Sequence, residues 1–374
     1  MGVASRPGPG IGARLAAIGA VSGAVLLLAG CGVDRTAPPA ITPEGGPNAT
    51  GAVFAYRTEG ELAVVRAGDT VRAPGSFGYS SAAVNFTRDG RYAFAVEAGS
   101  KTLVALGVRD GKVSRIECDC TDAVALRGSV VGWWREPGEI MSMDLAGTAP
   151  PETEREVELP DSPSPLSGGR FDDARLLAAT EDYLLVARVE SRGLWWEKSH
   201  LYAIGADAIL PLGRVPGIDA NTAAAAGRDS HQFVLTGTTG RSASCGTGHV
   251  ATIDVRSNAV LELPELPGEC SAAYSPRWGG DRSITVATRK WADLAGAPSE
   301  VDRLQSAAQG WAPVAEVPVV DMLPGAPESI VQVVAGDPTS ARETPNGVLF
   351  VEKGGTRTEL ATRVVSLGAP DTAK

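Results

Sequence analysis

Four cysteines are spaced so that they can pair, and pairing would be the most distinctive covalent chemistry of this sequence. Cys118 and Cys120 flank a single aspartate, and both sulfurs would lie on one face of an extended strand. Cys245 and Cys270 lie 25 positions apart. Cysteine pairs form structural disulfides in an oxidising compartment, whereas pairs of reactive thiols exchange disulfides or hold a soft metal ion such as copper. The sequence favours two structural disulfides and leaves a redox or copper-handling role open for Cys118 and Cys120.

Patterns for other kinds of catalysis are missing from the sequence. It contains no G-x-S-x-G, no HExxH and no P-loop, and His200, His231 and His249 do not have the spacing of zinc ligands. Residues 246–251 fit G-x-G-x-x-A, but a strand pattern follows where dinucleotide binding requires a helix. We therefore expect no catalytic residue, no metal site and no cofactor, and we do not expect an enzyme.

Tryptophans supply the candidate binding surface. They occur as two adjacent pairs and as a single residue in the segment 289–302, which interrupts the repeat pattern: Trp133, Trp134, Trp195, Trp196 and Trp291. Neighbours on a strand face opposite sides, so one member of each pair can pack inside while the other reaches a surface and contacts a ligand. The alternative is that both members pack in the interior.

An acidic run at 150–161 carries glutamates at alternate positions, Glu152, Glu154, Glu156 and Glu158. Alternation places all four on one face of a strand. A solvated strand face is the expected explanation, and a site for calcium or for a cationic partner is the alternative.

The N-terminus has the three-part layout of a secretory signal. Residues 1–14 contain Arg6 and Arg14 but no acid, an apolar run covers 15–28, and Leu-Ala-Gly-Cys ends at Cys31. This segment resembles a bacterial lipoprotein signal. The resemblance implies cleavage of residues 1–30, a lipid on Cys31, and a location on the extracytoplasmic face of the cell membrane. Residues 31–52, rich in proline and glycine, are a predicted flexible tether. Scarce lysine beside abundant alanine, glycine, proline and arginine is typical of an actinobacterium.

The chain as a whole has the composition of a folded, acidic protein. Hydrophobic residues make up 43% and charged residues 21%, which excludes disorder for the bulk of the chain. The net charge of −10 argues against non-specific nucleic-acid binding, which requires a basic surface.

A strand–turn–strand unit recurs through the body of the sequence, beginning near residues 62, 103, 140, 201, 250, 303 and 348. A second hairpin with an Asp-Gly turn precedes several of these units, most clearly at 86–96. A period of 40–50 residues with about four strands per unit predicts an all-β propeller over 53–367, followed by a flexible tail at 368–374. These hairpins resemble those of TolB-like, WD40-type and kelch-type propellers. Cys245 and Cys270 fall within one predicted blade.

The repeat also predicts how the ring closes. Seven units are counted, the first lacks room for its innermost strand, and strand-like residues remain after the last unit at 364–367. We therefore predict seven four-stranded blades, with the C-terminal strand completing the first and removing the open sheet edges.

These patterns favour a membrane-anchored, non-catalytic binding or scaffold module for a protein or cell-envelope ligand such as a glycan. We expect a monomer that does not bind nucleic acid. The alternatives are a propeller enzyme with an active site in its central channel, and a redox or copper-handling protein that uses Cys118 and Cys120.

Overall fold

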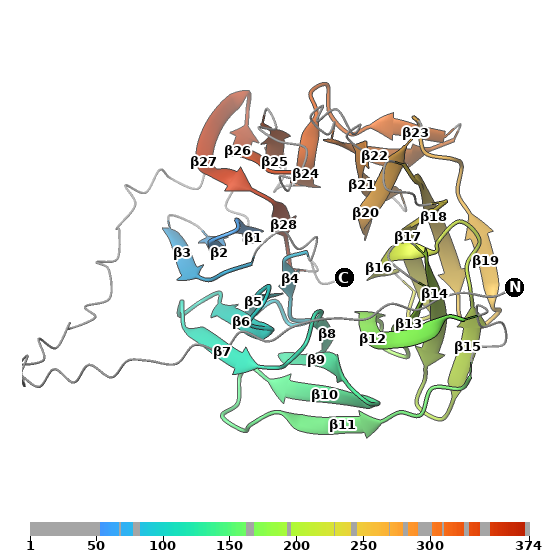
Figure 1. Cartoon of the computed structure of the whole chain (residues 1–374). Coiled ribbons are helices and arrows are strands. Elements are labelled where there is room, and N and C mark those ends of the chain that lie inside the picture. The colour runs from blue at the N-terminus through green and yellow to red at the C-terminus, as the bar shows by residue number, and fades with distance from the viewer. Residues whose placement is uncertain are drawn as a thin grey trace, which may run out of the picture. The chain divides into compact units, whose positions relative to one another are not determined.

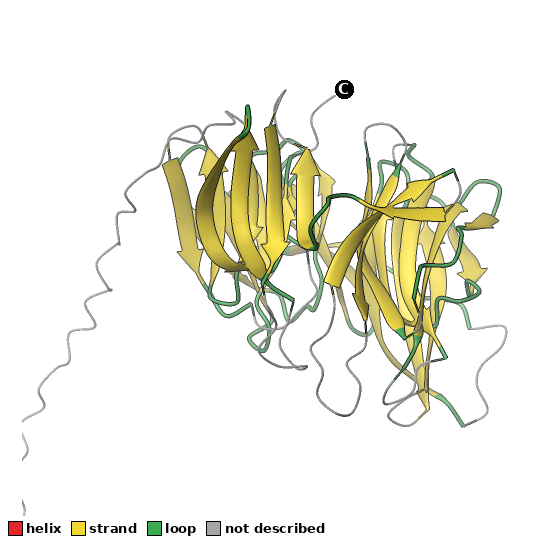
Figure 2. Cartoon of the chain, turned by 90° about the horizontal axis from the view of Figure 1, so that it is seen from above, coloured by secondary structure: helices red, strands yellow, loops and turns green. Residues whose placement is uncertain are grey.

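The computed structural model describes residues 53–66, 69–77, 83–161, 168–192, 196–227, 229–240, 245–268, 270–279, 283–290, 301–308, 310–324, 329–336 and 345–370. Within these ranges the regular structure consists of strands, and no helix occurs (Figures 1 and 2). Phe54 begins the first strand and Gly368 ends the last. The all-β prediction is confirmed.

The strands form seven four-stranded antiparallel sheets, which we number as blades 1 to 7 and describe from the innermost strand outwards. Blade 1 contains β28 (Ser366–Gly368), β1 (Phe54–Arg57), β2 (Glu61–Arg66) and β3 (Asp69–Pro74). Blade 2 contains β4 (Asn85–Phe86), β5 (Tyr92–Val96), β6 (Thr102–Gly107) and β7 (Val113–Glu117). Blade 3 contains β8 (Val124–Arg127), β9 (Val130–Arg135), β10 (Glu139–Asp144) and β11 (Glu152–Glu156).

The second half of the ring has longer strands. Blade 4 contains β12 (Arg170–Ala179), β13 (Leu184–Arg192), β14 (Trp196–Ile204) and β15 (Ile209–Gly213). Blade 5 contains β16 (Ala220–Ala226), β17 (Gln232–Thr239), β18 (Thr247–Asp254) and β19 (Ala259–Glu262). Blade 6 contains β20 (Ser271–Trp278), β21 (Ile284–Lys290), β22 (Val301–Ala307) and β23 (Gly310–Pro313). Blade 7 contains β24 (Val319–Pro324), β25 (Ser329–Ala335), β26 (Gly347–Lys353) and β27 (Thr356–Val364).

Both faces of each blade are apolar because each blade is packed between two others. Even-numbered residues of β13, such as Val186, pack with Trp134 and Ile140 of blade 3, whereas Leu185 packs with Phe233 of blade 5. This double burial explains why the middle strands appear in the sequence as short continuous apolar runs rather than as alternating patterns.

The ring closes through the C-terminal strand, as predicted. β28 pairs with β1 in the antiparallel register Ala55↔Gly368, and Figure 1 shows the two strands side by side although they are the last and first strands of the chain. Leu367 is fully buried in a cluster shared with blade 7. Seven blades and the predicted closure are therefore confirmed.

A buried ion cluster joins the closing strand to blades 6 and 7. The Asp321 carboxylate of β24 accepts hydrogen bonds from Arg277 of β20 at 2.7 and 2.8 Å and from the Leu367 amide of β28 at 2.8 Å. Arg303 of β22 lies 3.1 Å from the same carboxylate, and burial lowers the pKa of its guanidinium to about 10, so it stays charged at neutral pH. One aspartate thus fixes the position of three strands.

The two ends of the sheets differ in the length of their connections. At one end, which we call the crossover end, each blade passes to the next and its second strand turns into its third; this end carries the long segments 75–84, 157–169, 240–246, 291–300 and 336–346. The opposite turn end carries short hairpins such as 128–129, 308–309 and 354–355. Because β1 runs toward the crossover end, the chain enters the propeller at the turn end, and the last residues leave there as well.

Candidate functional site

The first tryptophan pair is almost wholly buried, which corrects the prediction that one member reaches an exposed surface, although Trp134 borders a cleft described below. Trp133 and Trp134 point to opposite sides of β9, as expected, but each side is an interface with another blade. Trp133 is 1% exposed and packs toward blade 2, and Trp134 is 6% exposed and packs toward blade 4. Inside a ring, both faces of a strand are interior, so alternation brings neither indole to the outside.

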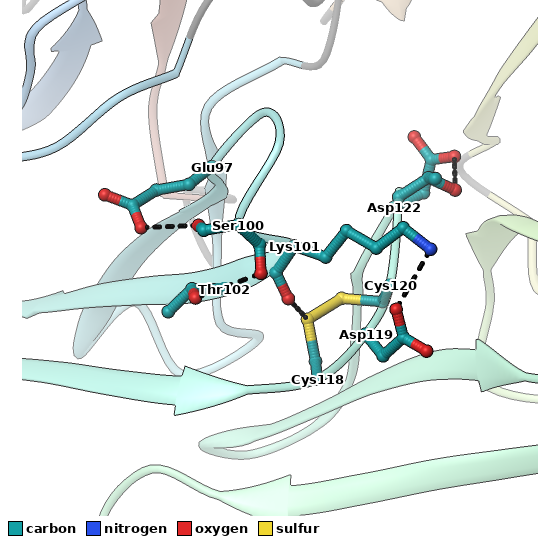
Figure 3. Close-up of a disulfide and its surroundings, with 9 residues drawn as sticks. Glu97, Ser100, Lys101, Thr102, Cys118, Asp119, Cys120 and Asp122 are labelled. Atoms are coloured by element: carbon teal, nitrogen blue, oxygen red, sulfur yellow. Dashed lines mark hydrogen bonds and ion pairs between the residues drawn. A yellow bond between two sulfur atoms is a disulfide. The ribbon is translucent and has the colours of Figure 1, made fainter. Parts of the chain in front are cut away.

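The predicted disulfide between Cys118 and Cys120 forms at the crossover end, between blades 2 and 3 (Figure 3). The segment is not extended, because Asp119 has a positive φ of 48° and turns the chain between the two cysteines. Both cysteines are almost completely buried, and Sγ of Cys118 contacts the Lys101 carbonyl oxygen at 2.9 Å. Above them, the Lys101 ammonium pairs with the Asp119 carboxylate at 2.9 Å. The disulfide therefore closes a tight turn within one loop, and the two contacts with Lys101 connect that loop to the neighbouring one.

The second disulfide, Cys245–Cys270, also forms, but it does not lie within one blade as predicted. Cys245 precedes β18 of blade 5, and Cys270 immediately precedes β20, the innermost strand of blade 6. The repeat pattern assigned both cysteines to one blade. In the structure, β19, the outer strand of blade 5, and the crossover to blade 6 lie between them. The bond is therefore a link between neighbouring blades.

A polar surface lies on the face of blade 4 that turns toward blade 3. In the register of this sheet, Arg188 opposes His200 and Glu190 opposes both Phe171 and Lys198, so these five side chains share one face. Strands β13 and β14 extend further toward the crossover end than their blade 3 counterparts. The longer strands leave this end of the sheet without an apolar blade to pack against, and polar residues occupy it.

An acidic cleft of about 940 Å³ opens between this surface and blade 3. Its walls combine four carboxylates, two aromatic rings, one guanidinium and several apolar groups, among them Glu136, Glu139, Glu156, Glu158, Trp134, Phe171 and Arg188. The Glu136 carboxylate accepts hydrogen bonds from Trp134 Nε1 at 2.9 Å and from the Ala174 amide at 2.7 Å, which ties the two blades together at the base of the cleft.

A second cleft of about 580 Å³ continues along the same face of blade 4. It is lined by Lys198, His200 and Asp219 and by the exposed Arg214, which belongs to the crossover segment 214–219 after β15. The Lys198 ammonium lies 2.5 Å from the Asp219 carboxylate. With two cations against one carboxylate, this cleft has the opposite sign to the acidic cleft.

The two clefts are separated by a ring contact above a buried acid–base pair. Phe171 meets the edge of the His200 ring at a centroid distance of 5.7 Å. His200 Nε2 lies 2.9 Å from the Glu190 carboxylate, and both side chains are at most 2% exposed. A carboxylate that orients an imidazole is an arrangement that proton-transfer sites use, and it also satisfies a buried histidine.

The sequence did not single out Glu136, Phe171, Arg188 or Glu190, and it treated His200 as an ordinary histidine. The signal in the sequence that these residues meet is the unusual length of β13 and β14. A strand-propensity pattern does not reveal that these strands extend past the neighbouring blade.

Several predicted site residues lie outside the described part of the chain. Cys31, Trp195 and Trp291 belong to this group, and the structure describes only the backbone at Trp196. Among the described residues, no group of three or more His, Cys, Asp or Glu side chains is arranged to hold a metal ion. Also within the described ranges, no helix has the length and apolar character needed to cross a membrane.

The chain is a seven-bladed β-propeller, and solved structures with this kind of fold are similar to it. No known family model and no curated protein matches the sequence. A protein described as TolB from Agrobacterium tumefaciens is 12% identical, with a TM-score of 0.46 and coverage of 83% of this chain and 98% of that one. A luciferin-regenerating enzyme is 15% identical, with a TM-score of 0.44 and coverage of 76% and 94%. YCF48 bound to D1 peptide is 13% identical, with a TM-score of 0.44 and coverage of 81% and 88%.

Proposed function

We propose that this protein is a lipid-anchored, extracytoplasmic propeller that binds a protein or cell-envelope ligand at its crossover end without transforming it. One observation carries the proposal: both clefts and both disulfides lie at the crossover end, where the long connections are also found. Rigid scaffolds position binding loops in this way.

Site-specific photo-crosslinking in the native membrane tests the binding end. A crosslinking residue in place of Glu158, at the acidic cleft, should capture a reproducible ligand. The same residue in place of Ser257, in a turn-end hairpin of blade 5, is the matched control and should capture none. Equal capture at both positions, or capture only at Ser257, would contradict the proposal.

The membrane anchor is tested separately with Cys31→Ala. The wild-type protein should incorporate labelled palmitate and sediment with membranes, whereas the variant should lose both properties because it has no thiol to acylate. A variant that still carries label would show that the lipid is attached elsewhere or that the anchor is not a lipid on this cysteine.

Acid–base catalysis is the second candidate function, and the buried His200–Glu190 pair between the clefts is the observation that favours it. If the protein is an enzyme, ligand captured by the wild-type protein should be released in altered form, and His200→Gln should release it unchanged. Recovery of an intact ligand from both proteins would leave binding as the function. The redox alternative is disfavoured because a reactive cysteine pair must be accessible, and Cys118 and Cys120 are buried.

A further inference from the structure

We infer that the acidic cleft between blades 3 and 4 receives a cationic side chain, lysine or arginine, from an extended segment of a protein ligand. This inference rests on the proposed binding function and specifies the chemistry of the group that is bound. It explains why negative charge is concentrated where the fold opens a cleft.

The cleft holds negative charge that the protein does not neutralise. Glu139 and Glu156 are directly opposed across β10 and β11, an arrangement that repels. Glu139 forms an ion pair at 2.5 Å with Arg135 of β9, the strand that flanks β10 on the side away from β11. Within the described residues, neither Glu156 nor Glu158 has an ion-pair or hydrogen-bond partner on its side chain. A ligand cation would relieve this repulsion.

Among the described residues that line the cleft, Arg188 is the cation, and it is already engaged. The Arg188 guanidinium lies over the Phe171 ring, with Cζ 4.2 Å from the centroid, and is thereby directed to the blade 4 side. Within the described residues, no ion pair joins it to the glutamates of blade 3.

Other occupants fit less well. A sugar ring would require an exposed aromatic face, but Trp134 is 6% exposed and Arg188 covers Phe171. A calcium ion requires six to eight oxygen ligands, and hydrogen bonds and ion pairs already occupy Glu136 and Glu139. An anion would be repelled. The volume of about 940 Å³ admits a long side chain together with part of its backbone.

The adjoining cleft supports a ligand that is a protein segment rather than a free amine. It borders the same face of blade 4 at His200, whose ring contacts Phe171 of the acidic cleft, and it carries Lys198 and Arg214. A chain that places a basic side chain in the acidic cleft would continue over a surface of opposite sign. An acidic cleft next to a basic one fixes the direction in which a segment with complementary charges binds.

Calorimetric titration of the full-length protein, purified from membranes in detergent, tests the inference with two blocked peptides. One contains three Gly-Arg repeats, and the other has the neutral isostere citrulline in place of each arginine. The arginine peptide should bind at least about tenfold more tightly, because a charge-assisted hydrogen bond contributes that much. Glu156→Gln/Glu158→Gln should remove about tenfold of this affinity.

A matched variant controls for net charge. Glu262→Gln/Glu265→Gln also removes two negative charges, but from exposed positions at and after the end of β19 in blade 5. This variant should leave the affinity unchanged. Equal affinity for the two peptides, or equal weakening by both double variants, would overturn the inference. If crosslinking from the crossover end still captures a ligand in that case, the binding function stands and only the cationic assignment is wrong.

Discussion

Burial determines which residues of this chain are available to react or to bind. The adjacent tryptophans Trp133 and Trp134 and the closely spaced cysteines Cys118 and Cys120, which attract attention in the sequence, are almost wholly buried. The acidic cleft is instead lined mainly by glutamates, with Arg188, Phe171 and the edge of the buried Trp134. Position in the ring, rather than residue type, gives them their role.

The Cys118–Cys120 disulfide should resist mild reduction in the folded protein. Its sulfurs are shielded by the core between blades 2 and 3, so a thiolate cannot reach them without local opening. Alkylation and mass spectrometry after incubation with glutathione should find these two cysteines unmodified, and modified once urea is added. Rapid labelling without urea would instead support a redox function.

Asp321→Asn should be strongly destabilising. The substitution leaves Arg303, which is 1% exposed, and the partly buried Arg277 without their counter-charge, and breaking such a buried pair costs about 3–5 kcal/mol. Urea unfolding measures the loss. Asp207→Asn, an exposed turn residue in blade 4, is the control and should change the free energy of unfolding by no more than about 0.5 kcal/mol. Similar small effects for both variants would show that the cluster is not a stabilising link.

Part of the acid sensitivity of the protein should come from Glu154. Its hydrogen bond from Arg127, opposed by burial, lowers the pKa of this carboxyl below its ordinary value of 4.5. Because the folded state binds the proton less tightly than the unfolded state, the pair stabilises the fold above about pH 4.5 and ceases to do so as the pH falls through the lowered pKa.

Arg127→Gln tests this dependence. The variant should be less stable than the wild type at pH 7 and should lose less stability on acidification from pH 5 to pH 3, as measured by urea unfolding. Arg109→Gln, at an exposed turn position of blade 2, should follow the wild-type curve. Parallel curves for all three proteins would exclude a contribution from the Glu154 pair.

At the scale of the elements, the closing strand is the most informative one. Deletion of 366–374 removes β28, exposes the inner edge of β1 and uncovers the buried cluster around Leu367. We expect a fall in melting temperature of at least 10 °C, because a strand and part of a core are lost together. Deletion of 371–374, which lies beyond the described residues, should have no effect. An unchanged melting temperature after the longer deletion would refute closure by β28.

At the scale of the whole molecule, the ring depends on contacts between blades. The Cys245–Cys270 bond joins blades 5 and 6, so its removal should loosen an interface rather than a single sheet. Cys245→Ser/Cys270→Ser should lower the free energy of unfolding by about 3 kcal/mol, the value expected for a 25-residue loop. Hydrogen exchange should rise first in β18, β19 and β20. Exchange that rises evenly around the ring would argue against a local role.

From the amino-acid sequence alone came the repeat, a count of about seven blades, the mode of closure and the four cysteines available for disulfides, whereas the pairing of those cysteines and the exact number of blades came from the structure. These features are local or periodic: a hairpin is specified by a turn flanked by apolar runs, and a missing strand in the first unit is matched by an extra one at the end. The sequence did not determine the blade that each disulfide joins, the burial of Trp133 and Trp134, or the clefts beside blade 4. Those depend on which side chains face each other across neighbouring sheets and on how far one blade extends past the next, and only the folded ring brings these distant residues together.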